Sequence, residues 1–247
     1  MPSDPFFLST AILAILLIGI SKAGFGGTMG SLAVPLVSLS VGAPRAAAIL
    51  LPILLVMDAA GLLVFRGKAD FANLRIMFPG ALIGIALGAT FFHWVDARWI
   101  KAIVGAEAFL FGVNILLQTH ANPRPPGIAR GLFWSCVSGF TSFISHAGGP
   151  PILQYLLPQG MERTRMVATM TFFFSVVNFA KLLPYAMLGL LNASNLLTSA
   201  CLLPVVPAGY LIGLKLLKTL PRALFDKIIA VSMILTGIKL LSETPFF

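Results

Sequence analysis

The stretch Ser21-Lys22-Ala23-Gly24-Phe25-Gly26-Gly27 interrupts the first apolar segment of the chain, and Ser145-His146-Ala147-Gly148-Gly149-Pro150 interrupts another about half a chain later. Both stretches contain a serine, a basic residue, an alanine and a glycine in the same order, which predicts that the chain contains two copies of one unit. Apolar helices that are broken in this way are typical of binding sites inside a membrane.

The composition predicts a polytopic membrane protein. Of the 247 residues 58% are hydrophobic and 10% are charged, which is more apolar surface than a soluble domain can bury. The net charge of +9 comes from Lys and Arg residues that lie singly or in pairs between apolar runs, a pattern that favours membrane topogenesis over nucleic-acid binding. We therefore expect one integral membrane domain over residues 1–247, with the lipid bilayer and no nucleic acid as its partner.

Each half of the chain contains five apolar segments. Repeat 1 covers residues 6–118 and repeat 2 covers residues 130–242, and the proline-rich linker 119–129 joins them. The last three segments of each repeat have the length of a transmembrane helix, whereas the first two form a short, glycine-rich hairpin that either crosses the membrane or is re-entrant. The predicted segments are 6–21, 26–39, 45–65, 74–92 and 99–118, followed by 130–145, 148–157, 165–190, 196–217 and 223–241.

Two local patterns add detail to these segments. Gly80, Gly84 and Gly88 form a row of small residues that predicts a close contact between helices. Pro184, Pro204 and Pro207 are expected to kink the helices that contain them.

The distribution of basic residues predicts the orientation of the halves. If both termini lie outside, most Lys and Arg residues face the cytoplasm, as the positive-inside rule requires. The fold class that follows is an all-α membrane protein, a helical bundle of two inverted-topology repeats with both termini in the periplasm. The basic residues that would then face out are Arg45, Arg98, Lys101 and Lys239.

The paired breaks predict an anion-binding cavity between the halves. A broken helix at bilayer depth must be buried in protein or line water, and the N–H groups at the start of a helix attract negative charge. Lys22 and His146 occupy matching places in the two stretches and add positive charge. The candidate substrate contacts are Ser21, Lys22, Gly24, Gly26, Gly27, Ser145, His146, Gly148 and Gly149.

Lys181 is a further candidate contact, because an ionisable residue inside an apolar segment is a functional candidate by default. Asp58 is its predicted partner, and Asn178 occupies the position that corresponds to Asp58 in the second half. The Asp58–Lys181 pair either holds the halves together or takes part in substrate binding or proton relay. Glu107 has either a structural role or a role in coupling, for which a proton or a sodium ion is the expected partner.

Two other classes of function remain as alternatives. Asp58, Glu107 and His146 could coordinate the cation of a metal permease, although three dispersed ligands are a weak signal. A membrane-embedded enzyme would need Ser145 and His146 as a nucleophile and its base, but adjacent residues on a helix do not face each other. We therefore expect neither an enzyme nor a bound cofactor or metal; the oligomeric state and the direction of transport stay open.

The sequence resembles the sulfite exporter TauE/SafE family, also called the toluene sulfonate uptake permeases. The resemblance rests on Gly24-Phe25-Gly26-Gly27 with Pro35, and on Gly139 with Ala147-Gly148-Gly149-Pro150, and it covers nearly the whole chain. It implies a duplicated protein of the bacterial inner membrane that exports or imports sulfite, sulfoacetate or other organosulfonates, with both glycine turns in contact with the substrate. The chain differs from the family pattern at Pro150-Pro151 and at His146, which leaves the particular anion open.

Together, the residues and the resemblance predict a secondary transporter. We expect it to export small sulfur-containing anions by alternating access of its two inverted halves.

Overall fold

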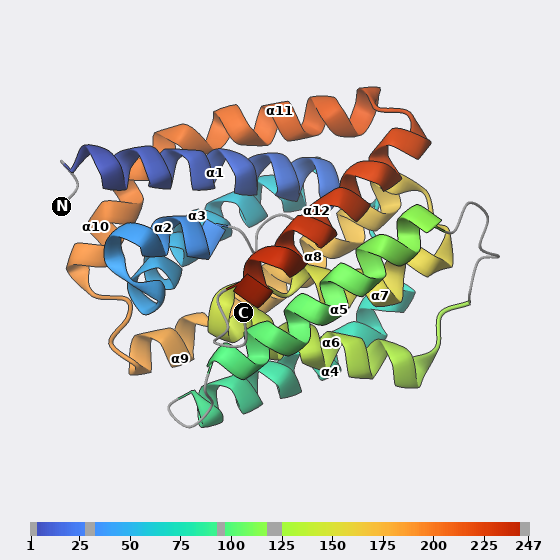
Figure 1. Ribbon diagram of the computed structural model, residues 1–247, viewed down its shortest axis with the longest axis horizontal. Helices are drawn as coiled ribbons and strands as arrows, with labels where there is room; N and C mark the ends of the chain where they lie inside the picture. Colours follow the sequence, from blue (N-terminus) through green and yellow to red (C-terminus); the bar gives the residue numbers. More distant parts are fainter. Residues whose placement is uncertain (1–3, 28–32, 93–96, 118–124, 243–247) are drawn as a thin grey trace.

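The computed structural model describes residues 4–27, 33–92, 97–117 and 125–242, and every regular element in these ranges is a helix. The elements form one elongated bundle (Figure 1). The first half contains α1 (Pro5–Phe25), α2 (Ala33–Val41), α3 (Ala43–Val64), α4 (Phe71–Phe91) and α5 (Ala97–Leu117). The second half contains α6 (Ile128–Ser145), α7 (Gly149–Leu156), η2 (Leu157–Gln159), α8 (Arg163–Ala180), α9 (Leu182–Met187), α10 (Ala193–Leu202), η3 (Leu203–Val205), α11 (Val206–Thr219) and α12 (Arg222–Ser242).

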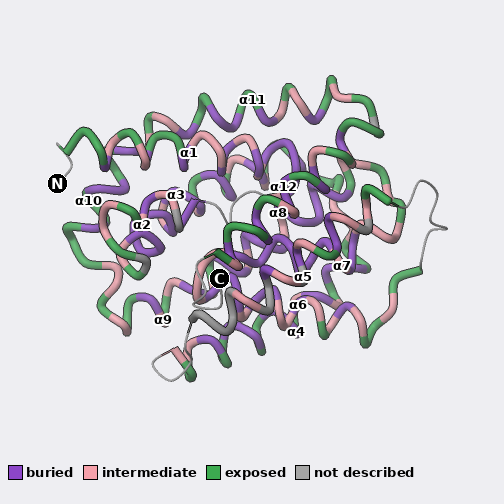
Figure 2. The backbone as a smooth tube through the Cα atoms, viewed as in Figure 1, coloured by how far each residue is buried: buried purple, intermediate pink, exposed green. Residues whose placement is uncertain are grey.

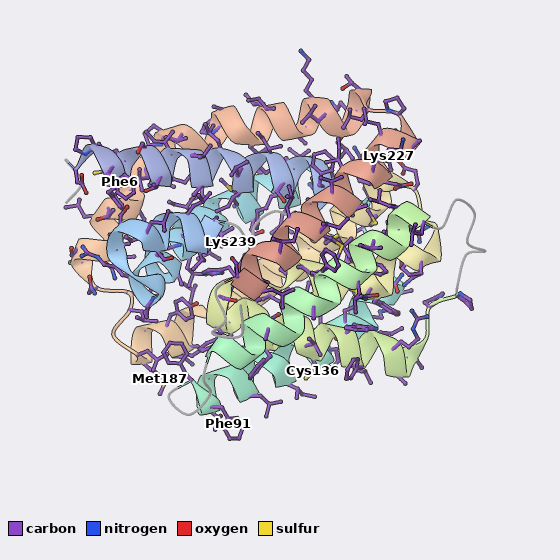
Figure 3. All side chains as sticks on the ribbon, in the orientation of Figure 1. Phe6, Phe91, Cys136, Met187, Lys227 and Lys239 are labelled. Atoms are coloured by element: carbon purple, nitrogen blue, oxygen red, sulfur yellow. The ribbon has the colours of Figure 1, made fainter. Side chains whose placement is uncertain are left out.

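The protein is a multi-pass membrane protein. Five stretches of the described residues are long and apolar enough to cross a bilayer, namely Pro5–Phe25, Pro44–Val64, Phe71–Phe91, Arg163–Met187 and Ala193–Thr219. Buried residues follow the inner faces of the helices, and exposed ones follow the outer faces (Figure 2). Large apolar side chains such as Phe6, Phe91 and Met187 point away from the bundle (Figure 3), as expected for a surface that contacts lipid.

The first helix is longer than the predicted segment 6–21. Asp4 caps its N-terminus through a hydrogen bond from the Phe6 N–H, and the helix ends only at Phe25. Lys22 therefore lies inside the last turn of α1, and its side chain projects from a regular helix rather than from an irregular turn. The segment that was predicted to begin at Gly26 is a helix from Ala33, and residues 28–32 lie outside the described part of the chain.

Prolines divide two of the predicted helices. The segment 165–190 consists of α8 and α9, which meet at Lys181. Pro184 has no N–H to donate to the carbonyl of the preceding turn, which explains the interruption. Pro204 lies in η3 between α10 and α11. The kinks predicted at Pro184 and Pro204 are confirmed, whereas Pro207 lies in the first turn of α11, where a proline is tolerated.

Close helix pairs hold the bundle together. The most extensive contacts join α4 with α6, α5 with α12, and α1 with α11. The glycine row of α4 lies on α6, where a Cβ atom added to Gly84 would be 2.0 Å from the carbonyl oxygen of Cys136. On α11, a Cβ atom added to Gly213 would be 2.6 Å from the carbonyl oxygen of Ile20. The close contact predicted from the small-residue row is thus confirmed, and α1 with α11 makes a second one.

Candidate functional site

The two glycine-rich breaks adopt the same backbone geometry. Gly26 directly follows α1 and His146 directly follows α6, and both of these residues are left-handed, with φ of 68° and 54°. After each, an N–H reaches back into the helix: Gly27 donates to the Ser21 carbonyl at 2.9 Å, and Ala147 donates to the Thr141 carbonyl at 3.4 Å. His146 is the only described residue other than glycine with a positive φ.

This geometry corrects one expected correspondence. The sequence match placed Lys22 opposite His146, but the left-handed turn places Gly26 opposite His146. The difference is one helical turn, because α1 continues past Lys22 whereas α6 ends just before His146. Lys22 consequently corresponds to Ser142, which also lies one turn before the left-handed residue.

The Asp58 cluster consists of Asp58, Lys22 and Asn178, which come from α3, α1 and α8. Lys22 forms an ion pair with Asp58 Oδ1, and Asn178 Nδ2 donates to Oδ2 at 2.7 Å. Asp58 is 2% exposed. Both carboxylate oxygens therefore have a donor, which a buried charge requires.

The Lys181 cluster consists of Lys181, Ser142 and His146. Lys181 Nζ lies 3.2 Å from the Ser142 carbonyl oxygen, 3.1 Å from Ser142 Oγ and 2.9 Å from His146 Nδ1. His146 Nε2 lies 3.2 Å from the carbonyl oxygen of Ala47 on α3. The predicted pair of Lys181 with Asp58 is wrong: Lys22 occupies that place, and Lys181 reaches the end of α6 instead.

A cavity lies between these two clusters, and it is called the anion cavity below after the ligand that the sequence predicts. It contains about 420 Å³ of space not filled by atoms. The polar residues and glycines that line it come from the two breaks and from α8, which contributes Asn178. The lining residues are Ile18, Lys22, Gly27, Leu50, Leu54, Ser142, His146, Gly149, Phe174 and Asn178.

A smaller cavity of about 210 Å³ lies on the other side of Lys22 and is called the Asp58 cavity below. Lys22 and Phe174 line both cavities, so the lysine side chain separates them. The other residues that line it are Gly26, Met57, Asp58, Thr171 and Tyr210.

Several predicted contacts have packing roles in the structure. A Cβ atom added to Gly24 would lie 2.9 Å from the Gly213 carbonyl oxygen on α11, and Gly148 is equally close to Ser138 on α6. Ser145 Oγ donates to the Thr141 carbonyl at 3.3 Å, and Ser21 is fully buried; neither serine is among the lining residues of the two cavities.

The second break has fewer free N–H groups than expected. Pro150 and Pro151 occupy the first turn of α7 and have no N–H, so the amides of Gly148 and Gly149 are the ones available at this helix start. In the first half, the start of the following helix lies outside the described residues.

Sequence reasoning missed several residues that line the two cavities, three of them with a polar or aromatic side chain that stands out. Ser142, Phe174 and Tyr210 line the cavities, yet each looks like an ordinary member of an apolar helix. Ser142 could have been found from its spacing to His146, because residues four apart lie on the same face of a helix.

The alternative ligands of a metal do not gather in the described structure. Within the residues searched, no group of three His, Cys, Asp or Glu side chains is placed to hold a metal ion. Glu107 lies on α5, but its side chain is outside the described part. Cys136 and Cys201 are free thiols, on α6 and α10.

The comparisons with known proteins agree with the motifs at both breaks. The family described as "Sulfite exporter TauE/SafE" matches residues 11–240, which include both glycine turns and both clusters. The chain belongs to the sulfite exporter TauE/SafE family. The resemblance predicted from the two glycine turns is confirmed, and this TauE/SafE protein is thereby a member of a family of membrane transporters. Neither a curated protein nor a solved structure matches the chain.

Proposed function

We propose that this TauE/SafE protein is a secondary transporter that exports a small sulfur-containing anion, such as sulfite, sulfoacetate or another organosulfonate, and that the anion binds in the anion cavity. The observation that carries the proposal is Lys181, a fully buried lysine whose three neighbours are neutral acceptors. Within the described residues, no carboxylate forms an ion pair with it.

The charges around the anion cavity favour an anion over a cation. Three acceptors around Lys181 Nζ match the three hydrogens of an ammonium group. The proposal takes Lys181 as protonated, so that Lys22 and Lys181 together carry two positive charges against the one negative charge of Asp58. The excess charge lies behind Ser142 and His146, which line the cavity, so a bound monoanion would compensate it.

The proposed mechanism is alternating access of two inverted repeats. Contacts between the halves are reciprocal. Helix α1 of the first half packs on α11 of the second, and its counterpart α6 packs on α4 of the first half. In the same way, α3 packs on α10, and its counterpart α8 packs on α4. The ends of the helices repeat this relation, because Arg165 pairs with Asp70 at 2.8 Å and Arg45 Nε donates to Asn195 at 3.2 Å. Rocking of the halves would open the cavity to one side at a time.

The location and the driving ion follow from the same proposal. The distribution of basic residues supports the bacterial inner membrane with both termini in the periplasm. A proton or sodium gradient would drive transport, since the proposal assigns no chemical reaction to the protein. The hydrogen bonds of Ser145 to Thr141, and of His146 to Lys181 and Ala47, support this non-enzymatic role because they leave no nucleophile–base pair between the two residues.

The test is ligand-induced thermal stabilisation of the purified protein in detergent. We would measure the midpoint of unfolding with sulfite, thiosulfate, sulfoacetate, taurine, sulfate, chloride and divalent metals. The proposal expects stabilisation by at least one sulfur anion, which Lys22→Ala abolishes and Lys215→Ala, at an exposed position of α11, preserves. Stabilisation by divalent metals alone would overturn it in favour of the cation permease.

A further inference from the structure

The hydroxyl of Tyr210 is buried without a hydrogen-bond partner. Tyr210 lies on α11, is 6% exposed, and its hydroxyl oxygen contacts no donor or acceptor of the described structure. Buried tyrosines nearly always pair their hydroxyl, because an unpaired polar group in a low-dielectric interior is unfavourable. The orphaned hydroxyl therefore indicates a partner that arrives in another state of the protein.

The surroundings of this hydroxyl point to Asp58 as that partner. Tyr210 and Asp58 both line the Asp58 cavity. The hydroxyl lies over Gly61, where an added Cβ atom would be 2.8 Å from the hydroxyl oxygen. Gly61 follows Asp58 by three residues on α3, so the two positions share one face of the helix. Thr171 also lines the cavity, but its hydroxyl already donates to the Val167 carbonyl at 2.8 Å.

Lys22 is the group whose movement would free Asp58. Its side chain lines both cavities and now pairs with Asp58 Oδ1, while Asn178 holds Oδ2. An anion in the anion cavity competes with Asp58 for the same ammonium group. If Lys22 turned to the anion, Oδ1 would lose its donor, and a buried carboxylate without its donors is strongly unfavourable.

We propose that Tyr210 is a positioning residue that replaces Lys22 on Asp58 when an anion binds. The Tyr210 O–H then donates to the oxygen that Lys22 leaves, and Asn178 continues to donate to the other. Lys22 becomes available to the anion, and Asp58 stays ionised with two donors. This inference rests on the proposed function, because it assigns Tyr210 a role in binding the same anion.

Tyr210→Phe separates this role from a structural one. In the empty protein the hydroxyl has no partner, so its removal should leave the thermal midpoint unchanged or raise it. Affinity for the anion should fall about tenfold, because the hydrogen bond to a charged group forms only in the bound state. Tyr155→Phe is the matched control: its hydroxyl is likewise buried without a partner, but Tyr155 lines neither cavity.

A double-mutant cycle with Asp58→Asn tests the partner. An uncharged amide no longer competes strongly for Lys22, so in the Asp58→Asn background we expect Tyr210→Phe to change affinity less than twofold. The measurement is isothermal titration of sulfite, or of whichever sulfur anion stabilises the wild type, into each purified variant. If Asp58→Asn does not fold, the anion affinities of Tyr210→Phe and Tyr155→Phe still decide whether the Tyr210 hydroxyl takes part in binding.

The outcomes distinguish this inference from the proposed function. If the wild type binds no anion, the proposed function fails. If the wild type binds an anion and Tyr210→Phe binds it equally well, the positioning role is wrong while the proposed function stands. A lower thermal midpoint of empty Tyr210→Phe, with unchanged affinity, would make Tyr210 a packing residue.

Discussion

The Asp58 cluster and the Lys181 cluster surround a lysine in two different ways, one around the partly buried Lys22 and the other around the fully buried Lys181. In the first, Lys22 is compensated by a carboxylate; in the second, Lys181 has only neutral acceptors. The two breaks correspond, since the left-handed residues Gly26 and His146 are 120 residues apart, as are Asp58 and Asn178. The two lysines do not correspond, because Lys22 matches Ser142. The comparison teaches that similar backbone geometry in two halves can give one lysine a carboxylate partner and leave another among neutral acceptors.

The largest effect is expected from the uncompensated lysine. Lys181→Met keeps most of the side-chain volume and removes the ammonium, so we expect anion affinity to fall about a hundredfold. Titration calorimetry with the stabilising anion measures this. Leu183→Met, at an exposed position of α9, is the control. Binding that survives Lys181→Met would mean that Lys22 alone provides the attraction.

The helix pairs that look alike in both halves should respond alike. Gly84→Ala on α4 and Gly213→Ala on α11 each push a Cβ atom into a neighbouring backbone. We expect each to destabilise the protein by about 1–3 kcal/mol, the usual result of overpacking. Thermal unfolding checks this, with Gly127→Ala as the control because no atom lies within 4 Å of its added Cβ. A loss in only one pair would show that the halves differ in packing as well as in charge.

A smaller change tests whether the difference in charge between the clusters matters. Asn178→Asp places a second carboxylate beside Asp58 and removes the Nδ2 donor. We expect about tenfold weaker anion binding at neutral pH, because two adjacent carboxylates repel each other and the anion. The affinity should recover as the pH falls and one carboxylate is protonated; a loss that is independent of pH would contradict this explanation.

The smallest effect is expected at the helix ends. The Arg165 side chain is 55% exposed in its pair with Asp70, so Arg165→Gln should lower stability by at most about 1 kcal/mol. Arg45→Gln, at the corresponding position of α3, removes hydrogen bonds to Asn195 and Ser194 and should likewise lower stability by at most about 1 kcal/mol. Thermal unfolding measures both variants, and a loss well above about 1 kcal/mol at either position would refute this expectation.

The sequence predicted the helical segments well because their signals are local. Apolar runs, prolines and the linker limit where a membrane helix can begin and end, and ten predicted segments correspond to the helices of the two halves. The end of α1 was predicted too early, because a basic residue and a glycine resemble a helix end. In a membrane protein the hydrogen bonds of the backbone favour continuation of the helix through both.

The site was predicted only in part. Lys22, Gly27, His146 and Gly149 line the anion cavity as the broken helices suggested, whereas the predicted partner of Asp58 was wrong. Both Lys22 and Lys181 are lysines inside apolar segments, and the sequence holds no information on which side chain reaches across to α3. Residues without charge, such as Ser142 and Tyr210, give no signal of their own before their neighbours are known.

The sequence by itself determined the membrane environment, the number of apolar segments, the two breaks and the family, because composition, glycines and prolines act on the chain locally. Only the tertiary structure decided that Lys22 pairs with Asp58, that Lys181 lies among neutral acceptors and that the Tyr210 hydroxyl has no hydrogen-bond partner within the described residues. These facts depend on distances between helices that are far apart in the chain. Burial makes each such distance decisive, since a charge or hydroxyl removed from water must find its partner within the protein.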